Sequence, residues 1–352
     1  MSGSHRRGPV STDAMAPALW WRGANIPNDI ADTLARIGPL RGDEVFTEEI
    51  AMALASGNER CLVVALAARS IPAGPTPDTG DAPDTGPATF AVVIEDVRSE
   101  ARRWTVETVA PGNLPSLHHD LLRAVANHHQ CPSLLFWRPP TTPADEEFAV
   151  PAGSRRDRTI LEMHTRLPLA PETGGSRPIP LVQYRAFCSI ANVDASAFVD
   201  SVVAINNAAF ADHPEQGALS HSVFALRTTA PWFDAHGLSI ATVDGRDIGF
   251  VWMKCAPARP AELYVVAVDP TSSVPGLGRA LVRHGFAHAD RAHGATHAML
   301  FVDAANERAM GLYRSLGFCA VRRQDVVQIT TPESRPFMRS SQRGDHVSES
   351  RT

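Results

Sequence analysis

Two glycines, Gly276 and Gly278, stand where a strand pattern gives way to a helix pattern. An apolar run from Val265 to Val268 precedes them, and the pair Asp269-Pro270 interrupts the run. The first turn of a helix has backbone N–H groups without a helical acceptor and carries the positive end of the helix dipole, so it attracts anions. The segment predicts a phosphate-binding loop, although an ordinary strand-turn-helix connection has the same pattern.

A lysine and a glutamate form a second candidate group. Lys254 ends one predicted strand, Glu262 begins the next, and a simple hairpin connection would make them face each other. The period of two then places Tyr264, Val266 and Val268 on the same face. Glu262 is either half of an ordinary ion pair or a base that points into a cleft. Lys254 is the only lysine among 33 Lys and Arg residues, which fits either chance or a need for a compact ammonium.

A tyrosine lies on a third candidate element, the helix predicted over residues 306–316. Tyr313 falls on the inner face of this helix with Ala309, Leu312 and Leu316, and Gly317 would end the helix. Such a tyrosine is either a core residue with a satisfied hydroxyl or a proton donor.

The composition bounds the class of protein. A chain of 352 residues suits two domains, and a net charge of -5 with scattered basic residues favours neither nucleic acid nor a membrane as partner. The five cysteines are far apart, which favours free thiols over disulfides or zinc. No run is long enough to cross a bilayer and no signal peptide is recognisable. We expect a soluble, cytoplasmic monomer.

The pattern of elements predicts two similar domains. We expect a domain at 16–168, a Pro- and Gly-rich linker at 169–181, a second domain at 182–331 and a disordered tail at 332–352. The predicted strands are 61–68, 90–97, 104–109, 134–137, 159–167, 238–243, 248–254 and 298–302; the predicted helices fall within 30–55, 116–129 and 197–210; 71–88 reads as a disordered loop. Asp244-Gly245 predicts a hairpin turn.

The first domain repeats the order strand, turn and helix but lacks the glycines. When Pro111 is laid over Pro270, Leu117 and His119 take the two glycine positions. Their side chains would crowd a pyrophosphate, so this half should bind a phosphate-bearing ligand poorly. The histidine pairs of the 116–129 helix lack metal-ligand spacing, and we expect them on the surface.

The second half resembles a known superfamily. VVAVDPTSSVPGLGRAL and NERAMGLYRSLGF resemble the acetyl-CoA-binding core of the GNAT N-acetyltransferases. Within that superfamily, NNAAFADHPEQGALS, APWFDAHGL, GFVWMK and ELYVVAVDP are similar to the mycothiol synthase family. The resemblance implies an α+β fold of two tandem GNAT units, each a mixed sheet flanked by helices, with the second unit catalytic. It also implies acetyl-CoA as acetyl donor and the amine of cysteinyl-glucosaminyl-inositol as acceptor.

The resemblance also implies roles for individual residues. Glu262 would be the base and Tyr313 the acid in a direct attack without an acyl-enzyme, and no metal is implied. The coenzyme would contact Val266, Ala267, Val268, Ser273, Val274, Pro275, Gly276, Leu277, Gly278, Arg279, Asn306, Glu307, Arg308, Ala309, Met310 and Gly311. The substrate would contact Glu48, Glu215, Lys254, Glu262 and Phe301.

Two departures from the family pattern leave alternatives open. Ser273, Val274 and Pro275 replace a glutamine and arginines, which removes a cation and one backbone donor near the pyrophosphate. Phe301 replaces a substrate-contacting tyrosine. An acetyltransferase for another amine, or a non-catalytic acyl-CoA-binding protein, would fit these departures.

Overall fold

The computed structural model describes residues 18–22, 61–67, 87–96, 103–109, 133–138, 141–142, 154–171, 182–187, 193–211, 219–257 and 259–330. The chain forms two compact units. The first unit comprises residues 1–139, 148–157 and 326–352, and the second comprises 140–147 and 158–325.

These units do not divide at the predicted linker. Residues 158–168 group with the second unit rather than the first, and 326–331 group with the first rather than the second. The units divide in this way because strands that are far apart in the sequence pair with each other. Strand β6 (Ser154–Arg166) pairs along its later residues with β11 (His297–Asp303), while the end of β12 (Cys319–Thr330) pairs with β5 (Ser133–Trp137).

The first unit contains an ordered run of strands. These are β1 (Ala18–Arg22), β2 (Cys61–Ala67), β3 (Pro87–Asp96), β4 (Arg103–Val109) and β5, with β1 to β4 antiparallel and β5 parallel to β4. The strands predicted from 61 to 137 are therefore confirmed. Of the predicted disordered loop, residues 71–86 lie outside the described residues, while Pro87 and Ala88 already belong to β3. The predicted helices at 30–55 and 116–129, Leu117 and His119 included, also lie outside them.

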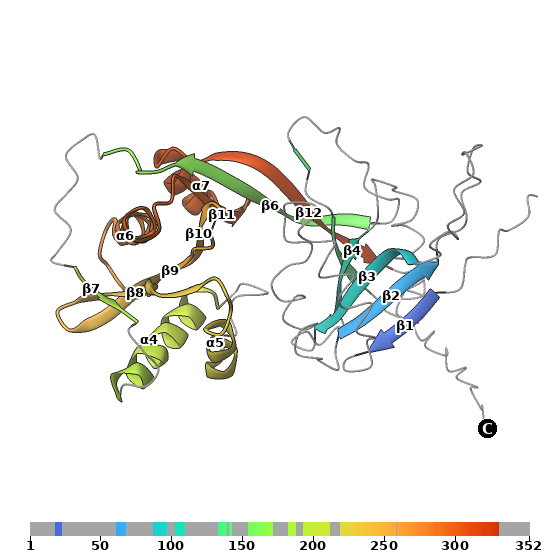
Figure 1. Ribbon diagram of the computed structural model, residues 1–352, viewed down its shortest axis with the longest axis horizontal. Coiled ribbons are helices and arrows are strands. Elements are labelled where there is room, and N and C mark those ends of the chain that lie inside the picture. Colours follow the sequence, from blue (N-terminus) through green and yellow to red (C-terminus); the bar gives the residue numbers. More distant parts are fainter. Residues whose placement is uncertain are drawn as a thin grey trace, which may run out of the picture. The chain divides into compact units, whose positions relative to one another are not determined.

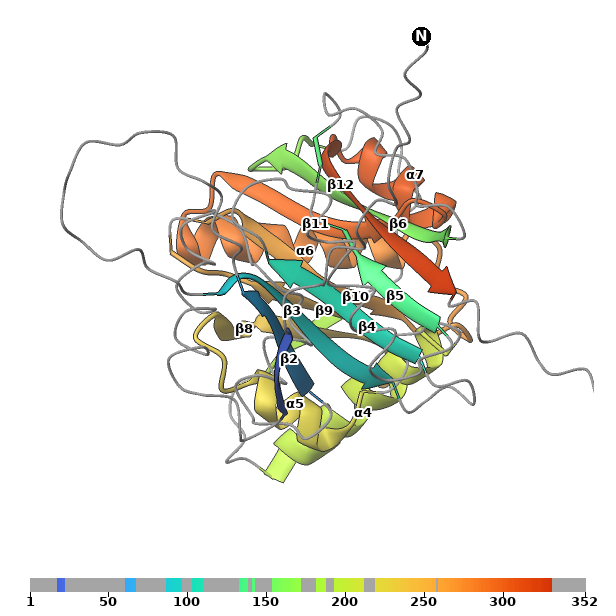
Figure 2. The same cartoon turned by 90° about the vertical axis from the view of Figure 1, so that its right-hand side faces the viewer.

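The second unit is a mixed sheet with helices on both faces. Its strand order is β12-β6-β11-β10-β9-β8-β7, with β12 contributing its residues up to Asp325 and with β7 (Gln183–Ala186), β8 (Phe233–Val243), β9 (Arg246–Lys254) and β10 (Ala261–Val268). Its helices are α4 (Val193–Ala209), α5 (His221–Arg227), α6 (Leu277–His293) and α7 (Glu307–Ser315). Figure 1 shows α4 and α5 on one side of β8 and β9 and α6 on the other, and Figure 2 shows β11 running beside β6.

Each face of this sheet has its own hydrophobic core. On the face covered by α6 and α7, which we call the α6 face, Met253, Leu263 and Phe286 belong to one buried cluster. On the opposite face, the α4 face, Phe250 and Trp252 pack with residues of α4 and α5. The alternation of neighbouring residues between two clusters shows that both faces of the central strands are buried, as their nearly continuous apolar sequences indicate.

The predicted hairpin between β8 and β9 is confirmed. Asp244 and Gly245 have φ of 49° and 77°, the left-handed values that a two-residue hairpin turn of type I′ requires. Beside the turn Val243 faces Arg246, and beyond a one-residue register shift between Ala241 and Thr242, Ile240 faces Phe250. Strands β7 and β12 and helix α5 were not among the predicted elements.

The face assignment predicted for β10 is wrong beyond Tyr264. Leu263 pairs with Met253 and Val265 with the preceding Trp252, so Tyr264 is an extra residue, a β-bulge. Tyr264 and Val265 consequently both pack on the α4 face, and Val266 packs on the α6 face. An inserted residue reverses every later side chain because the strand period is two.

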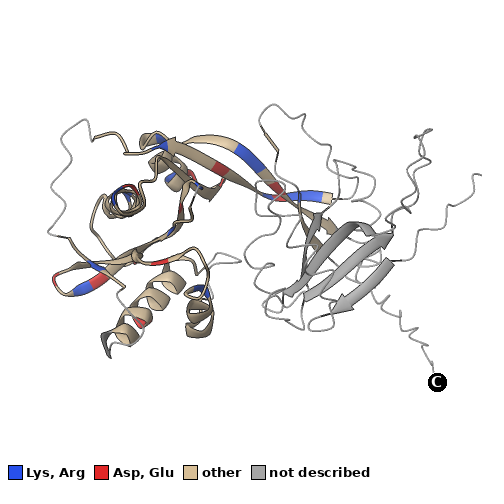
Figure 3. Ribbon diagram, in the orientation of Figure 1, with Lys and Arg blue, Asp and Glu red and all other residues tan. Residues whose placement is uncertain are grey.

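Charged residues of both signs are scattered over the described elements (Figure 3). This distribution is consistent with the scattered charge of the sequence. None of the described helices combines the length and the apolar character needed to cross a membrane.

Candidate functional site

The loop before α6 has the backbone geometry that its glycines predict. Gly276 caps the helix with φ 80° and ψ 0°, a left-handed conformation that favours glycine. The first intrahelical bond runs from the Ala280 N–H to the Gly276 carbonyl at 3.0 Å. Gly278 and Arg279 come before Ala280, so their N–H groups have no acceptor within the helix. These groups point out of the helix end, as an anion site requires.

Gly278 leaves space at this helix end. A Cβ atom built on it would meet only Leu312 at 3.9 Å and Val268 at 4.0 Å, which are ordinary contacts. The protein itself therefore does not require glycine here. A ligand that approaches the backbone closely would require glycine at this position, and the sequence pattern indicates such a ligand.

Asp269 shapes the loop. Its carboxylate accepts from the Thr271 N–H at 2.8 Å and from the Arg246 guanidinium at 2.7 Å. The hydrogen bonds from the Thr271 backbone and hydroxyl, followed by Arg246, lower the pKa of Asp269. Arg279, the one cation among the predicted loop residues, donates instead to the Ser315 hydroxyl of α7 at 2.6 Å. Backbone groups are thus the main donors that the loop presents.

Strand β10 separates from β11 at the bulge. Within the described residues, the parallel ladder between them covers only Ala261, Glu262 and Leu263. From Val265 to Val268 the strand remains paired with β9. The other backbone edge of this segment is therefore open to a ligand, and it includes the predicted coenzyme contacts Val266, Ala267 and Val268.

The register confirms that Lys254 and Glu262 face each other. Lys254 Nζ lies 3.6 Å from Glu262 Oε2, and their side chains are 10% and 15% exposed. The Lys254 ammonium also lies 5.3 Å from the centre of the Trp232 ring, on the α4 face. An exposed ion pair of little consequence is therefore excluded, because two charges this deeply buried carry a desolvation cost that needs compensating contacts.

Tyr313 lies on the other face of the sheet. It is 7% exposed and belongs to the α6-face core, with its ring 6.1 Å from that of Phe318. Burial raises the pKa of its hydroxyl to about 12, so the group keeps its proton at neutral pH. Glu262 and Tyr313 could act on one ligand only across the edge where β10 and β11 separate.

The predicted coenzyme residues at the start of α7 have mixed environments. The Asn306 side chain caps the helix by accepting from the Ala309 N–H at 3.0 Å. Glu307, Arg308 and Gly311 are exposed and Met310 is buried. Gly311 has no heavy atom within 4 Å of a built Cβ, so it also borders open space.

Phe301 is half exposed and has polar neighbours that the sequence reasoning missed. Phe301 faces Glu162 of β6, and Met299 lies between Glu262 on β10 and His164 on β6. Glu162 and His164 are joined at 2.6 Å, and Arg322 approaches Glu162 at 3.8 Å. The sequence contained one signal for this group: Glu162 and His164 lie two positions apart in a predicted strand, so their side chains share one face. Only the strand order places them in the same cross-strand rows as Phe301 and Glu262.

The remaining predicted site residues stand apart. Glu48 and Glu215 lie outside the described residues. Ser273, Val274, Pro275 and Leu277 occupy the loop and first turn, where Leu277 is buried and Val274 packs against the α6-face core. The structure therefore brings Lys254, Glu262 and the open part of β10 together.

Comparison with known proteins identifies the fold and the family. Residues 204–318 match the Acetyltransferase (GNAT) family. Two solved structures share the fold: a GCN5-related N-acetyltransferase from Sphaerobacter thermophilus (TM-score 0.56, 18% identity, covering 90% of this chain and 96% of that one) and a tandem GNAT protein from the clavulanic acid biosynthesis pathway (TM-score 0.58, 13% identity, covering 89% and 98%). At these identities the likeness concerns the fold alone, an α+β fold of two GNAT units.

Curated relatives are more similar in sequence. A mycothiol acetyltransferase of Thermomonospora curvata is 38% identical over 198 residues, 56% of this chain and 64% of that protein. The match to the Frankia alni protein of the same name is 36% identical and covers 54% of this chain and 58% of that protein, so the chain spans about three fifths of these relatives. The Propionibacterium freudenreichii protein of that name is 32% identical over 237 residues, 65% of this chain and 72% of its own length. This chain therefore belongs to the mycothiol acetyltransferase family.

Proposed function

We propose that this protein is an acetyl-CoA-dependent N-acetyltransferase that acetylates the cysteine amine of cysteinyl-glucosaminyl-inositol to form mycothiol. The observation that carries the proposal is the end of the β10–β11 ladder at Leu263, directly beside the buried Lys254–Glu262 pair. An open strand edge, a buried carboxylate and a glycine-capped helix start stand in one continuous segment. The acceptor is the one that the sequence resemblance implies, and the relatives named mycothiol acetyltransferase support it.

Acetyl-CoA fits the residues that remain open. Bound there, it would supply the acetyl group as a thioester. The backbone of Val266 to Val268 would hold the acyl end, because that edge of β10 lacks pairing with β11 among the described residues. The start of α6 at Gly276 and Gly278 would hold the pyrophosphate through backbone N–H groups. Pro275 contributes no N–H, so we expect weaker coenzyme binding than in relatives with a cation in this loop.

Glu262 would act as the base. A cysteinyl α-amine has a reference pKa of about 8 and is mostly protonated at neutral pH, so it must lose one proton before attack. Glu262 would accept that proton, directly or through water, while Lys254, whose ammonium lies over the Trp232 ring, would fix the position of the carboxylate. The amine nitrogen would then bond to the acyl carbon as the carbon–sulfur bond breaks, and the nitrogen would release its extra proton to water to leave the neutral amide.

Tyr313 would act as the acid. Its buried hydroxyl stays protonated, with a pKa of about 12, and would donate its proton to the departing sulfur. An N–H on the open edge of β10 would stabilise the negative oxygen that forms during attack. This assignment requires no metal. The second half of the chain would carry the reaction as a cytoplasmic monomer.

Phe301 favours a second candidate, an acetyltransferase for a different amine. Its ring is 50% exposed and pairs across the strands with Glu162, whereas the family pattern implies a hydroxyl at this position. An apolar ring cannot replace a hydrogen bond to a sugar or inositol hydroxyl. A less polar amine would suit this surface better.

An acetyl-transfer assay separates these possibilities. The full chain is incubated with acetyl-CoA and either cysteinyl-glucosaminyl-inositol or a panel of simpler amines, including cysteine and glucosamine. Release of CoA with N-acetylation of the first substrate supports the proposal. Transfer to another amine alone would assign the second candidate, and coenzyme binding without any transfer would exclude an acetyltransferase.

A further inference from the structure

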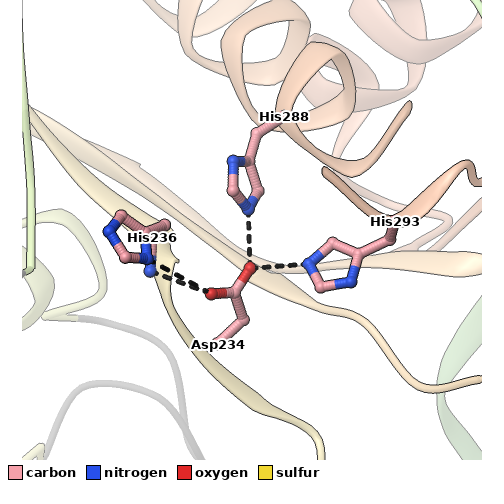
Figure 4. A network of polar contacts seen from close by, with 4 residues as sticks. All are labelled: Asp234, His236, His288 and His293. Atoms are coloured by element: carbon pink, nitrogen blue, oxygen red, sulfur yellow. Dashed lines mark hydrogen bonds and ion pairs between the residues drawn. The ribbon is translucent and has the colours of Figure 1, made fainter. Parts of the chain in front are cut away.

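Three ionisable side chains that have no role in the proposed reaction converge on one point (Figure 4). Asp234 Oδ2 lies 2.6 Å from His288 Nε2 and 2.8 Å from His293 Nε2. One donor atom from each side chain lies within 4.8 Å of the others. Among the described residues, no other group of three or more His, Cys, Asp or Glu side chains is this close.

The backbone positions this group from two elements. Asp234 lies near the start of β8, where the register with β9 shifts between Phe233 and Leu238 and frees the intervening residues from the ladder. His288 and His293 lie in the last part of α6, which ends at Gly294. Packing of α6 on the sheet through Phe286 and Ala289 holds the two histidines over β8.

The surroundings leave room for the carboxylate. A Cβ atom on Gly237 would lie 3.3 Å from Asp234 Oδ2, closer than most real contacts, so glycine at 237 gives the Asp234 side chain its position. The His236 N–H donates to Asp234 Oδ1 at 3.0 Å and orients the carboxylate, as Figure 4 shows. The Oδ2 atom is thereby directed to the two imidazoles.

The electrostatics favour a cation at the point of convergence. Asp234 places a carboxylate oxygen at the point where the two imidazole nitrogens meet. The C-terminal end of α6 adds the negative end of the helix dipole.

We propose that Asp234, His288 and His293 form a binding site for a divalent transition metal ion, with Zn²⁺ the preferred occupant. Two imidazole nitrogens and one carboxylate oxygen are a ligand set that zinc accepts, with water completing the coordination. Zinc–ligand bonds of about 2.0–2.2 Å place ligand atoms about 3.3 Å apart in a tetrahedron. The present separations of 2.6 and 2.8 Å would need to widen by about 0.7 and 0.5 Å, within the reach of side-chain rotation.

The metal would join the end of α6 to β8. Helix α6 begins at the proposed pyrophosphate loop, so this link would stabilise the helix that presents the loop. None of the three ligands belongs to the residues proposed for acetyl transfer. The metal proposal therefore goes beyond the proposed function and does not depend on it.

The test measures metal binding by the full chain without an affinity tag. After treatment with a chelator, the protein is titrated with Co²⁺, whose visible absorption reports a tetrahedral site, and then with Zn²⁺ in competition. We expect one tight site per chain. D234N, H288A and H293Q should each bind at least about 100-fold more weakly, because loss of an outer-shell partner alone costs 10- to 100-fold. Zn²⁺ should raise the melting temperature of the wild type and not of these variants.

His221 provides a matched control. It pairs with Asp200 at 2.7 Å in the same way but belongs to no group of three such side chains among the described residues. H221A should bind Zn²⁺ like the wild type. H293Q keeps a hydrogen-bond donor, so it should remain folded by circular dichroism.

Three outcomes would overturn the proposal. A wild-type protein that takes up no Zn²⁺ or Co²⁺ would reduce the cluster to a hydrogen-bonded network. Undiminished binding by folded H293Q would place the ion elsewhere, as would an equal loss in H221A.

Discussion

The two ends of β9 each carry an ion pair to the neighbouring strand or loop, and the pairs differ in burial. At one end, Arg246 contacts Asp269 at 2.7 Å, with the arginine side chain 62% exposed. At the other end, Lys254 contacts Glu262 at 3.6 Å, with both side chains at most 15% exposed. The exposed pair is the shorter one.

This difference separates a structural pair from a candidate reactive pair. Arg246 and Asp269 also bond Thr271, so their contacts shape the loop and leave little capacity for a ligand. The two carboxylates are about equally exposed, at 16% for Asp269 and 15% for Glu262. The pairs therefore differ in the cation, which is 62% exposed in Arg246 and 10% in Lys254. The Lys254–Glu262 pair therefore holds the more costly charges. A buried charged pair beside an open strand edge is a candidate for a binding or catalytic role.

The largest expected effect is on turnover after neutralising the buried carboxylate. E262Q removes the proposed base and should lower kcat by about 10²- to 10⁴-fold, the usual contribution of general base catalysis. D269N, at the other end of β9, should change kcat much less because that carboxylate only shapes the loop. Steady-state kinetics across pH 6–9, together with the Kd for acetyl-CoA, measure both. Full turnover by E262Q at every pH would remove Glu262 as the base.

The next effect concerns stability at the two ends of β9. K254M leaves the Glu262 charge buried without its ion-pair partner and should lower the free energy of unfolding by roughly 3 kcal/mol. R246M breaks an exposed pair and should cost under about 1 kcal/mol. Urea denaturation at neutral pH compares them. Equal losses would mean that burial does not distinguish the pairs.

The free energy of unfolding should depend on pH through the buried hydroxyl of Tyr313. Burial raises the pKa of Tyr313 from 10.0 to about 12, so between these values the unfolded chain loses this proton while the folded chain keeps it. The contribution is fully present below pH 10 and is lost as pH rises toward 12, by roughly 2 to 3 kcal/mol. Denaturation of wild type and Y313F at pH 9 and 11 isolates it. Parallel losses in both proteins would contradict the shift.

The smallest expected changes in stability come from the two loop glycines, whose substitutions should have different effects. G278A meets no close contact and should leave stability within about 1 kcal/mol while weakening acetyl-CoA binding, because the methyl group enters the proposed coenzyme space. G276A forces a side chain into φ 80° and should cost about 1 to 2 kcal/mol. Calorimetric titration with acetyl-CoA and denaturation measure the two effects. Unchanged coenzyme affinity in G278A would remove this position from the proposed site.

Local patterns predicted much of the second unit. The Asp244-Gly245 turn, the start of α6 at the glycines and the end of α7 before Gly317 depend on backbone conformations that particular residues favour. The pairing of Lys254 with Glu262 followed from a hairpin register. Predictions of this kind succeed because the interacting residues lie close together in sequence.

Structural features that depend on contacts between distant residues were missed or predicted incorrectly. The bulge at Tyr264 has no signature in the alternation of apolar residues, so the face of Val266 was assigned incorrectly. The division of the units follows the partners of β6 and β12, which the linker composition does not reveal. The roles of Glu48 and Glu215 stay predictions.

The sequence by itself determined the glycine-capped helix, the hairpin and the Lys254–Glu262 pair, because short-range sterics and strand periodicity set them. Only the tertiary structure decided where β10 leaves β11, and it puts Glu262 and Tyr313 on opposite faces of the sheet. It also decided that Asp234 meets two histidines of α6. Strand pairing and helix packing join residues far apart in the chain, and no local pattern records which partners they select.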